Sequence, residues 1–552
     1  MVINRTILPF LLLCSISVFQ GNPLKAQLKF VIEDFEGIAY GPDDLKANGL
    51  FVYGNTKANV DGKMAAHQAY SGERSLKINK EGSLTYGGWG KGVSLNVELD
   101  ITSDFLNFYI YADAANGTRS LKIELQDDDD SDNTYNKDRD DVWVTTKKIE
   151  AKNSWQLISI PLSEFKDNNE GGDDGFNISY KNGKFLSLLF SFEVGGKSTP
   201  GFTCWFDFIC LSQGKLPTGA AIFSPPSAQA TDFCGLGLWS KEGNSANFTD
   251  IALNFENSFK YGSDKKLGVI HFFQPFSFDG GNTQNAYPTV ERINKVIAAG
   301  YIPLVTLEDH FINAKPNTKQ PNLYSIVEGH FDSFFKDWAK QIKLAKGTVL
   351  LRILHEFNGD WYPWCTINND KDPQMVVKAY RHIHDIFKAQ DVTNVKFVWC
   401  PNSMSLPQEK WNFIMDAYPG DEYVDYVGLD IYNGAGQGIP LWRSFRKEGI
   451  ENYFILTQRL AHLPILVCEA ASRERGPGEP RTSQDKAEWI RQMAEALGSD
   501  MSRIRLLVWF NEKGTFKVTS SEPSQHSFLV NVLKNDYFSN GSKALKEFFE
   551  SK

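Results

Sequence analysis

Two regions of the chain differ in the period at which hydrophobic and polar residues alternate. From Gln27 to about Ser212, short runs with a period of two are separated by Gly, Asn and Asp; Phe105–Tyr111 and Trp155–Ile160 are examples. Side chains alternating in this way point to opposite faces of a strand, which predicts an all-β sandwich. The acidic stretch Asp127–Asp132 is interpreted as a solvated loop between two strands.

After a Pro-containing linker at residues 214–230, apolar strand-like runs alternate eight times with segments of helical period. The predicted strands are Gly235–Trp239, Leu267–Phe273, Ile302–Glu308, Val349–Glu356, Lys396–Pro401, Tyr426–Tyr432, Ile465–Ala470 and Ile504–Phe510. Repeated β-α units over roughly 320 residues predict a (β/α)8 TIM barrel with functional residues at the carboxyl ends of its strands. The alternative, a doubly wound open sheet, normally has a Gly-rich phosphate loop after its first strand, and the sequence shows none there.

Length and charge limit the function classes. A chain of 552 residues exceeds one ordinary hydrophobic core and therefore favours several domains. The net charge of −9 gives no general attraction for polyphosphate and argues against nucleic-acid binding. Aromatic residues make up 13% of the chain, which suits large cores and sugar-binding clefts alike.

The amino terminus has the features of an export signal. Arg5 precedes the apolar run Ile7–Phe19, which is shorter than the roughly 20 residues that span a bilayer, and Ala26 offers a small residue for cleavage. We expect a secreted, periplasmic or cell-surface protein consisting of a signal peptide (1–26), a β-sandwich module (27–213), a linker (214–230) and a barrel domain (231–552). Lipid anchoring at Cys14 is the less favoured alternative, because leucines rather than a small residue precede it.

The mature chain would keep an even number of cysteines, which permits disulfides in an exported protein. These cysteines are Cys204, Cys210, Cys234, Cys365, Cys400 and Cys468. Their spacing does not fit a zinc site, and they are interpreted mainly as small buried apolar residues, with any pairing left open.

Two predicted barrel strands end in a carboxylate, Glu356 on the fourth strand and Glu469 on the seventh. Burying a Glu at a barrel rim is costly unless the residue is paired or takes part in chemistry. Glycoside cleavage needs two such carboxyl groups facing each other, one protonated and one ionised. Arg352, four residues before Glu356, could hold a carboxylate by bidentate hydrogen bonding. A purely structural role for this pair is the competing interpretation.

The segment Arg352–Trp364 resembles the fourth-strand motif of family 26 glycoside hydrolases, retaining β-glycanases with a (β/α)8 barrel. The resemblance extends through Val424–Tyr432 and Pro464–Glu469 and covers about residues 231–540. It implies that Glu356 is the general acid/base and that Glu469 is the nucleophile.

The resemblance also implies roles for residues around this pair. Arg352 would support the carboxylates, His355 would hydrogen-bond near the nucleophile, and Trp361 would form part of the wall at the bond being cut. Tyr432 would orient the nucleophile, and Trp509 would be the platform under the sugar. The substrate-binding candidates are Arg352, His355, Trp361, Trp364, Tyr432, Trp509 and His310. Ordinary structural roles, such as rim aromatics or salt-bridge partners, are the alternative for each.

The resemblance leaves the sugar open. Mannan-cleaving members usually carry Trp-Phe-Trp-Trp after the acid, whereas this chain has Trp361-Tyr-Pro-Trp364, closer to members that cut mixed-linkage β-glucan. β-1,4-Mannan is the first expectation, mixed-linkage β-glucan the second, and β-1,3-xylan a distant third. A non-catalytic glycan-capture protein is an alternative from another class. We expect a monomer acting on polysaccharide, with no cofactor for catalysis, no membrane-spanning segment and no nucleic-acid partner.

The N-terminal region resembles family 11 carbohydrate-binding modules and related jelly-roll domains, through Ile32–Gly37 and Cys204–Cys210. The resemblance implies a jelly-roll sandwich that binds glycan chains. It also implies a structural calcium ion tying the first and last strands, with Glu36 and Asp207 as candidate ligands. Their alternative role is that of capping or turn carboxylates.

Overall fold

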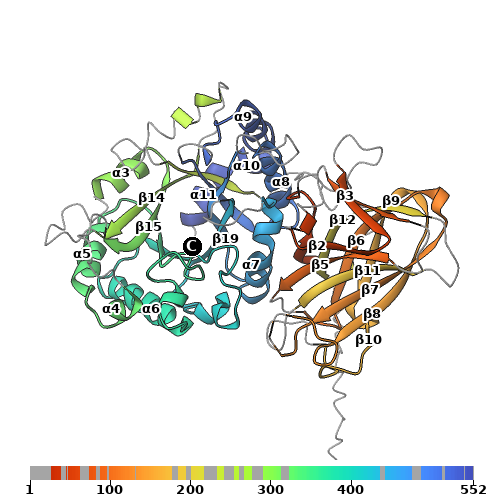
Figure 1. Cartoon of the computed structure of the whole chain (residues 1–552). Coiled ribbons are helices and arrows are strands. Elements are labelled where there is room, and N and C mark those ends of the chain that lie inside the picture. The colour runs from red at the N-terminus through yellow and green to blue at the C-terminus, as the bar shows by residue number, and fades with distance from the viewer. Residues whose placement is uncertain are drawn as a thin grey trace, which may run out of the picture.

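A computed structural model gives the arrangement of most of the chain (Figure 1). It describes residues 26–38, 45–46, 48–61, 74–81, 87–95, 99–130, 132, 134–176, 185–193, 201–216, 233–240, 254–255, 257–259, 267–276, 290–311, 322–434, 442–474, 486–512, 516–539 and 541–550. Residues 1–25 of the expected export signal, including Cys14, and residues 217–232 of the linker region lie outside this part. Among the described helices, none has the length and apolar character needed to cross a membrane.

The N-terminal module consists of two antiparallel sheets, as the period-two pattern predicts (Figure 1). In one sheet the order is β3 (Thr56–Asp61), β4 (Ser75–Lys80), β12 (Phe202–Gln213), β6 (Asp104–Ala112) and β9 (Lys152–Pro161), with β1 (Gln27–Glu33) paired to β12. In the other sheet the order is β10 (Lys166–Asp167), β8 (Val142–Ile149), β7 (Arg119–Asp127), β11 (Phe185–Glu193), β5 (Gly87–Leu95) and β2 (Leu50–Gly54).

Aromatic side chains from both sheets fill the core of the module. The ring of Trp89 on β5 stacks on Phe190 of β11 at a centroid distance of 4.8 Å, and Phe206 of β12 meets Trp89 edge-on at 5.1 Å. All three side chains are buried. This interdigitation of two inward faces is what makes the alternating pattern visible in the sequence.

The second domain is a closed barrel of eight parallel strands, and all eight predicted strands are confirmed. In order they are β13 (Gly235–Trp239), β14 (Val269–Phe276), β15 (Ile302–Phe311), β16 (Val349–Ile353), β17 (Val395–Trp399), β18 (Tyr426–Asn433), β19 (Ile465–Ser472) and β20 (Ile504–Phe510). In such a barrel the carboxyl ends of the strands meet at one face, where side chains distant in sequence can converge.

Helices surround the barrel, as the segments of helical period predict (Figure 1). They are α3 (Val290–Ala298), α4 (Leu323–Val327), α5 (Asp332–Ile342), α6 (Pro373–Ala389), α7 (Phe445–Arg459), α8 (Lys486–Gly498), α9 (Glu522–Phe528), α10 (Asp536–Ser539) and α11 (Gly541–Glu550). The start of α6 shows the local cause: the carboxylate of Asp372 accepts a hydrogen bond from the backbone N–H of Gln374 at 2.9 Å, and Pro373 occupies the first turn.

The module and the barrel are in direct contact, which the linker pattern does not predict. Strand β1 packs against α7, on the side of the barrel that faces the module (Figure 1). Lys447 of α7 donates to Glu33 of β1 at 2.9 Å, and Ser444 donates to Asp34 at 2.6 Å. Leu28 of β1 belongs to the same buried apolar cluster as the barrel residues. The two domains therefore share one hydrophobic interface.

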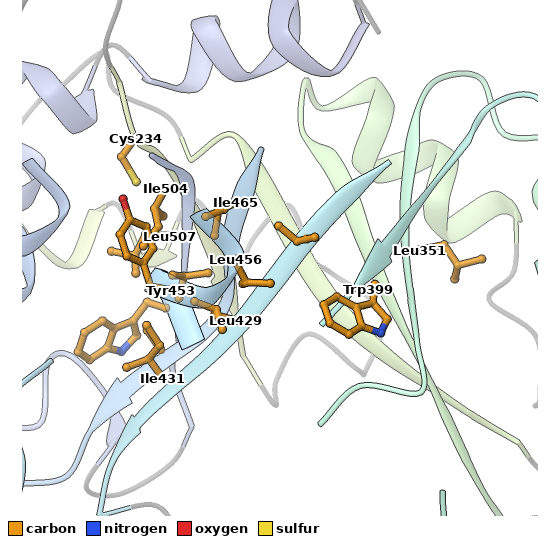
Figure 2. Packing of buried hydrophobic residues seen from close by; sticks show 14 of the residues in the cluster. Cys234, Leu351, Trp399, Leu429, Ile431, Tyr453, Leu456, Ile465, Ile504 and Leu507 are labelled. Carbon is orange, nitrogen blue, oxygen red and sulfur yellow. The ribbon is translucent and has the colours of Figure 1, made fainter. Parts of the chain in front are cut away.

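The interpretation of the cysteines as buried small residues is confirmed. The six cysteines of the described part are all buried and unpaired: Cys204, Cys210, Cys234, Cys365, Cys400 and Cys468. Figure 2 shows Cys234 among the buried apolar side chains of the barrel.

Candidate active site

The backbone leaves the barrel sheet in an unusual way just before Glu356. Strand β16 ends at Ile353, three residues earlier than the sequence pattern indicates, because Leu354 and Glu356 have left-handed φ angles of 50° and 52°. Such a conformation costs a non-glycine residue about 1 to 3 kcal/mol and is kept mainly where the surroundings fix it. Here the N–H of Glu356 donates to the carbonyl of Cys400 at 2.8 Å. The turn carries Glu356 to the carboxyl end of the strands.

The carboxyl group of Glu356 is buried among neutral hydrogen-bond donors. Trp361 Nε1 donates to its Oε2 at 2.7 Å, and Asn402 Nδ2 donates to its Oε1 at 3.0 Å. Burial and the nearby negative charge of Glu469 together raise the pKa of Glu356 to about 7. Near neutral pH, this group is therefore present in both its protonated and its ionised form.

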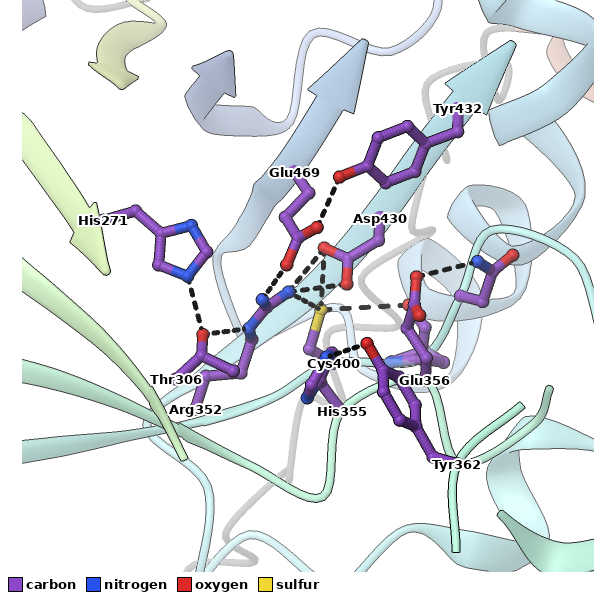
Figure 3. Close-up of polar contacts among 12 residues, drawn as sticks. His271, Thr306, Arg352, His355, Glu356, Tyr362, Cys400, Asp430, Tyr432 and Glu469 are labelled. Carbon is purple, nitrogen blue, oxygen red and sulfur yellow. Dashed lines mark hydrogen bonds and ion pairs between the residues drawn. The ribbon is translucent and has the colours of Figure 1, made fainter. Parts of the chain in front are cut away.

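Glu469 on β19 is bound in a different way. Arg352 donates to its Oε1, and the hydroxyl of Tyr432 donates to its Oε2 (Figure 3). The same guanidinium donates to Asp430 Oδ1 at 2.7 Å. Charge-assisted hydrogen bonds of this kind stabilise negative charge on Glu469. The two predicted carboxylates therefore meet at the barrel mouth in opposite surroundings.

The Arg352 side chain is fully buried and is held from its other side by neutral groups. Its Nε donates to Thr306 Oγ1 at 2.7 Å, and Thr306 lies 2.8 Å from His271 Nε2 (Figure 3). Burial and the Arg352 charge hold the pKa of His271 well below its usual range. Neutral His271 can accept the hydroxyl proton of Thr306, because the Thr306 oxygen is already an acceptor for Arg352. Sequence analysis missed both residues, and their only signal is a polar residue inside an apolar strand run.

Of the two tryptophans that follow Glu356, only Trp361 can face a ligand. Its side chain is 42% exposed and contacts Glu356 directly. Trp364 is fully buried, stacks on Tyr362 at 4.2 Å and donates Nε1 to the carbonyl of His355 at 2.7 Å. The prediction that Trp364 binds substrate is wrong, since its ring supports Tyr362 from inside the fold.

His355 also lies in the site, next to Tyr362. Its Nε2 is 3.1 Å from the Tyr362 hydroxyl (Figure 3). Its ring packs near Phe273, with a distance of 5.9 Å between the ring centroids. The resemblance implies a bond near the nucleophile, whereas this contact lies on the Glu356 side of the mouth.

Trp509 is not a sugar platform, and that prediction is also wrong. Its side chain is fully buried outside the strand ring, near Trp489 of α8 at 6.1 Å and Phe528 of α9 at 5.5 Å. The next residue, Phe510, points to the mouth instead and stacks on Trp239 at 3.9 Å. Successive strand residues face opposite sides, so an error of one position exchanges the inside for the outside.

A third carboxylate, Glu308 of β15, lies near the pair. It is partly buried, and burial together with the Glu469 charge raises its pKa to about 7. It ends a predicted strand, as Glu356 does, so the same signal could have identified it. His310, the candidate from this strand, falls within β15, but its side chain lies outside the described residues.

Asn402 is a further site residue that the sequence analysis missed. It follows β17, and its backbone N–H donates to Asn358 Oδ1 at 2.8 Å, which fixes the loop that points its amide at Glu356. Its only sequence signal is a polar residue directly after a strand.

The residues proposed for calcium in the module, Glu36 and Asp207, are both buried. Glu36 Oε1 accepts from the N–H of Arg74 at 2.8 Å, and Asp207 Oδ1 accepts from the N–H of Phe208 at 2.7 Å. Neither belongs to a group of three or more acidic, His or Cys ligands within the described ranges. Calcium binding by these two residues stays a prediction.

Comparisons with known proteins agree with this division of the chain. Residues 308–443 match the model described as glycosyl hydrolase family 26, and residues 40–213 match carbohydrate binding domain 30. The first match contains Glu356 and its neighbours. The second corrects the expected resemblance of the module to family 11.

Two curated relatives are similar to parts of the chain. Endoglucanase H of Acetivibrio thermocellus is 31% identical over 261 residues, which is 46% of this chain and 26% of that protein. A mannan endo-1,4-beta-mannosidase of Bacillus subtilis is 35% identical over 104 residues, 17% of this chain and 26% of the relative. The chain thus spans about a quarter of the length of each.

Among solved structures, the Podospora anserina GH26-CBM35 beta-(1,4)-mannanase is 14% identical, with a TM-score of 0.41, over 89% of this chain and 97% of that one. From the family matches, the barrel contains a glycoside hydrolase family 26 domain, and the N-terminal sandwich is a carbohydrate-binding domain of family 30.

Proposed function

We propose that the protein is an exported, monomeric, retaining endo-β-glycanase that hydrolyses β-1,4-mannan. One observation carries the proposal: two buried carboxyl groups share the barrel mouth, one among neutral donors and the other bound by Arg352 and Tyr432. Double displacement needs this division, since one carboxyl must donate a proton while the other must be ionised.

In the first step, a Glu469 oxygen attacks the anomeric carbon and forms a covalent glycosyl ester. The bond between that carbon and the leaving oxygen breaks, and Glu356 transfers its proton to the leaving oxygen. The pKa of Glu356, raised to about 7, keeps a protonated fraction available near neutrality. Arg352 and Tyr432 hold the attacking carboxylate in place before the reaction.

In the second step, Glu356 has lost its proton and acts as a base. It removes a proton from water, which attacks the anomeric carbon and releases Glu469 as a carboxylate. The Trp361 and Asn402 donors stabilise the ionised form of Glu356 between the two steps. Because Trp361 is also exposed, it is placed to contact the sugar next to the cleaved bond.

Relatives support β-mannan as the substrate, because several curated matches are named mannan endo-1,4-beta-mannosidase. A β-glucan containing 1,3 and 1,4 linkages is the second candidate. It is favoured by the Tyr362-Pro363 departure from the mannanase motif and by the match to endoglucanase H, which extends over 261 residues against 104 for the Bacillus mannosidase.

The N-terminal module would hold the enzyme on its polymer. On the outer face of its second sheet, Phe51 is 44% exposed and lies over Gly90, where an added Cβ would meet the ring at 2.3 Å. The neighbouring Tyr53 lies over Gly88 in the same way. Glycines that leave room for flat rings on an open sheet suit stacking against a sugar chain.

The test measures products from β-mannan, glucomannan, lichenan and β-1,3-xylan, with the anomeric form of the first product followed by NMR. We expect short β-linked oligosaccharides released with retained configuration, and fastest from mannan. Glu356→Ala should still cleave an aryl glycoside with a good leaving group, and azide should restore its turnover. Glu422→Gln, which changes an exposed barrel carboxylate, is the matched control. Inverted product, or no turnover of any polymer, would refute the proposal.

A further inference from the structure

Only part of the acidic stretch of the module is the solvated loop that its composition suggests, since Asp130 and Asp132 are exposed. Asp127 and Asp128 have no exposed surface, and neither has Asp141 at the other end of the loop between β7 and β8. Carboxylate oxygens of Asp127, Asp129 and Asp141 lie within 4.8 Å of one another. The segment thus folds back and brings like charges together in the interior.

Asp141 is shared by two such groups. On its other side its carboxylate lies within the same distance of Asp167, at the end of β10, and of Asp174 in the following turn. Strands β7, β8 and β10 lie side by side at one end of the module (Figure 1). Asp141 therefore stands where the β7–β8 loop meets the turn after β10.

Both carboxylate oxygens of Asp141 are buried and have no hydrogen-bond partner among the described residues. Asp127 differs, since its Oδ1 accepts from the N–H of Asp141 at 2.8 Å and its Oδ2 from Trp143 Nε1 at 3.1 Å. A buried carboxylate without donors is strongly unfavourable, and native proteins pair such a group or bind a metal with it.

Gly172 lies directly against the Asp141 carboxylate, where a larger residue would not fit. Gly172 has a φ of 80°, and a Cβ built on it would lie 1.8 Å from Asp141 Oδ1 and 2.8 Å from Asp129 Oδ2. The chain at residue 172 thus closes over the two carboxylates, leaving their oxygens facing one another.

The two cations of the loop are directed elsewhere, and Lys137 is exposed beside Asp138. Arg139 is about half exposed and pairs with Asp130 and with Asp132, at 2.9 Å for the latter, on the outer side of the loop. No ion pair of Asp141 with a Lys or Arg occurs within the described ranges. Asp141 is therefore not paired with a cationic side chain in the part of the chain that the structure describes.

We propose that Asp127, Asp129 and Asp141 bind one calcium ion, which fastens the β7–β8 loop to the turn containing Gly172. Calcium binds six to eight oxygens at about 2.3 to 2.6 Å, so two of its ligand oxygens lie at most about 5 Å apart. The ligand set contains only oxygen atoms, which argues against zinc, because zinc prefers nitrogen and sulfur ligands. Three protein carboxylates also suit calcium better than magnesium, which keeps several of its water ligands. This site is distinct from Glu36 and Asp207 and does not depend on the proposed hydrolysis.

The test uses the full-length protein, stripped with a chelator and titrated with calcium by calorimetry. We expect one ion per chain at this site and a rise in the melting temperature of several degrees. Terbium should bind in its place and emit when Trp143 is excited, because the Trp143 indole already contacts Asp127. Calcium, but not equimolar magnesium, should displace terbium.

Asp141→Asn should weaken calcium binding at least tenfold and remove the calcium-dependent rise in melting temperature. Asp138→Asn changes an exposed carboxylate of the same loop and should behave as the wild type. Terbium emission in the wild type reports on the site even if Asp141→Asn misfolds. Equal calcium binding in Asp141→Asn and the wild type would overturn the proposal. So would a wild-type protein that shows neither calcium binding nor terbium emission. Cleavage of short oligosaccharides should persist in Asp141→Asn, which separates this result from a failure of the proposed function.

Discussion

The barrel mouth and the β7–β8 end of the module are two regions where buried carboxylates cluster, and their counter-charges differ. At the barrel mouth, Arg352 bridges Glu469 and Asp430 through buried hydrogen bonds. In the module, Asp141 has no such partner within the described residues. Burial alone therefore does not define the role of a carboxylate, since the groups that balance its charge decide what it can do.

A raised pKa alone does not distinguish the two regions. Burial and a neighbouring carboxylate raise the pKa of Glu356 to about 7 and that of Asp127 to about 8. In the barrel, the exchangeable proton lies beside a partner that can act as a nucleophile. In the module, Asp127 lies beside Asp129 and Asp141 and accepts a hydrogen bond from the Trp143 indole, which is the arrangement proposed above to bind calcium.

The greatest loss of activity should follow from removing Glu469, the carboxylate that Arg352 and Tyr432 bind. Glu469→Ala should lower kcat by about 10⁴-fold or more, because it removes the group that forms the covalent intermediate. Initial rates of reducing-end release from mannan measure this, with Glu422→Gln as control. A residual rate within tenfold of the wild type would remove Glu469 from the role of nucleophile.

Removing the counter-charge should make the barrel mouth resemble the acidic end of the module. Arg352→Met leaves Asp430 and Glu469 buried without their cation, which should lower the free energy of unfolding by about 3 to 5 kcal/mol. Denaturant unfolding of the isolated variant measures the loss. Lys336→Met, which breaks an exposed pair with Asp332, should cost no more than about 1 kcal/mol.

Adding Asp430→Asn to Arg352→Met provides the sharper test. Removing one of the two stranded charges should recover part of the lost stability, since fewer uncompensated charges remain buried. If the double variant is less stable than Arg352→Met by the full cost of Asp430→Asn alone, Arg352 does not act as their shared counter-charge.

Much of the fold could be predicted because hydrophobic patterning is a local property of the sequence. The sandwich follows from alternation with a period of two. All eight barrel strands follow from apolar runs that alternate with segments of helical period. Glu356 and Glu469 were identified because a carboxylate that ends an apolar strand is itself a strong local signal. The contact of β1 with α7 joins positions more than 400 residues apart, and nothing in either segment announces it.

The errors arise where a side chain's direction depends on its neighbours. Trp509 and Phe510 are both aromatic strand-end residues, and only the packing of Trp509 against α8 and α9 decides which one faces the mouth. Trp364 turns inward because Tyr362 stacks on it. Composition likewise made the stretch beginning at Asp127 look solvated, although the return of the chain to Asp141 buries part of it.

A smaller effect on activity should separate the exposed tryptophan from the buried one. Trp361→Ala removes an exposed ring and a hydrogen bond to Glu356, so kcat/KM should fall about 10- to 100-fold. Trp509→Phe should lower the melting temperature but leave kcat and KM unchanged. A raised KM in Trp509→Phe would return that residue to the binding site.

The smallest effect is a shift in the pH dependence of activity. Glu356 must be protonated to release the leaving group, and its pKa is raised to about 7, so kcat/KM should fall as the pH rises through about 7. The amide of Asn402 stabilises the ionised form of Glu356. Asn402→Ala should therefore raise that pKa further and move the alkaline limb upward by about half a unit to one unit.

Glu308 offers the control for this shift, because burial and Glu469 raise its pKa to about 7 as well. If Glu356 is the titrating acid, Glu308→Gln should leave the position of the alkaline limb where it is in the wild type, whatever its effect on the rate. A limb that disappears in Glu308→Gln and stays fixed in Asn402→Ala would assign the titration to Glu308. Glu356 would then be, like Asp127, a buried carboxyl group with a raised pKa that does not transfer the proton of the reaction.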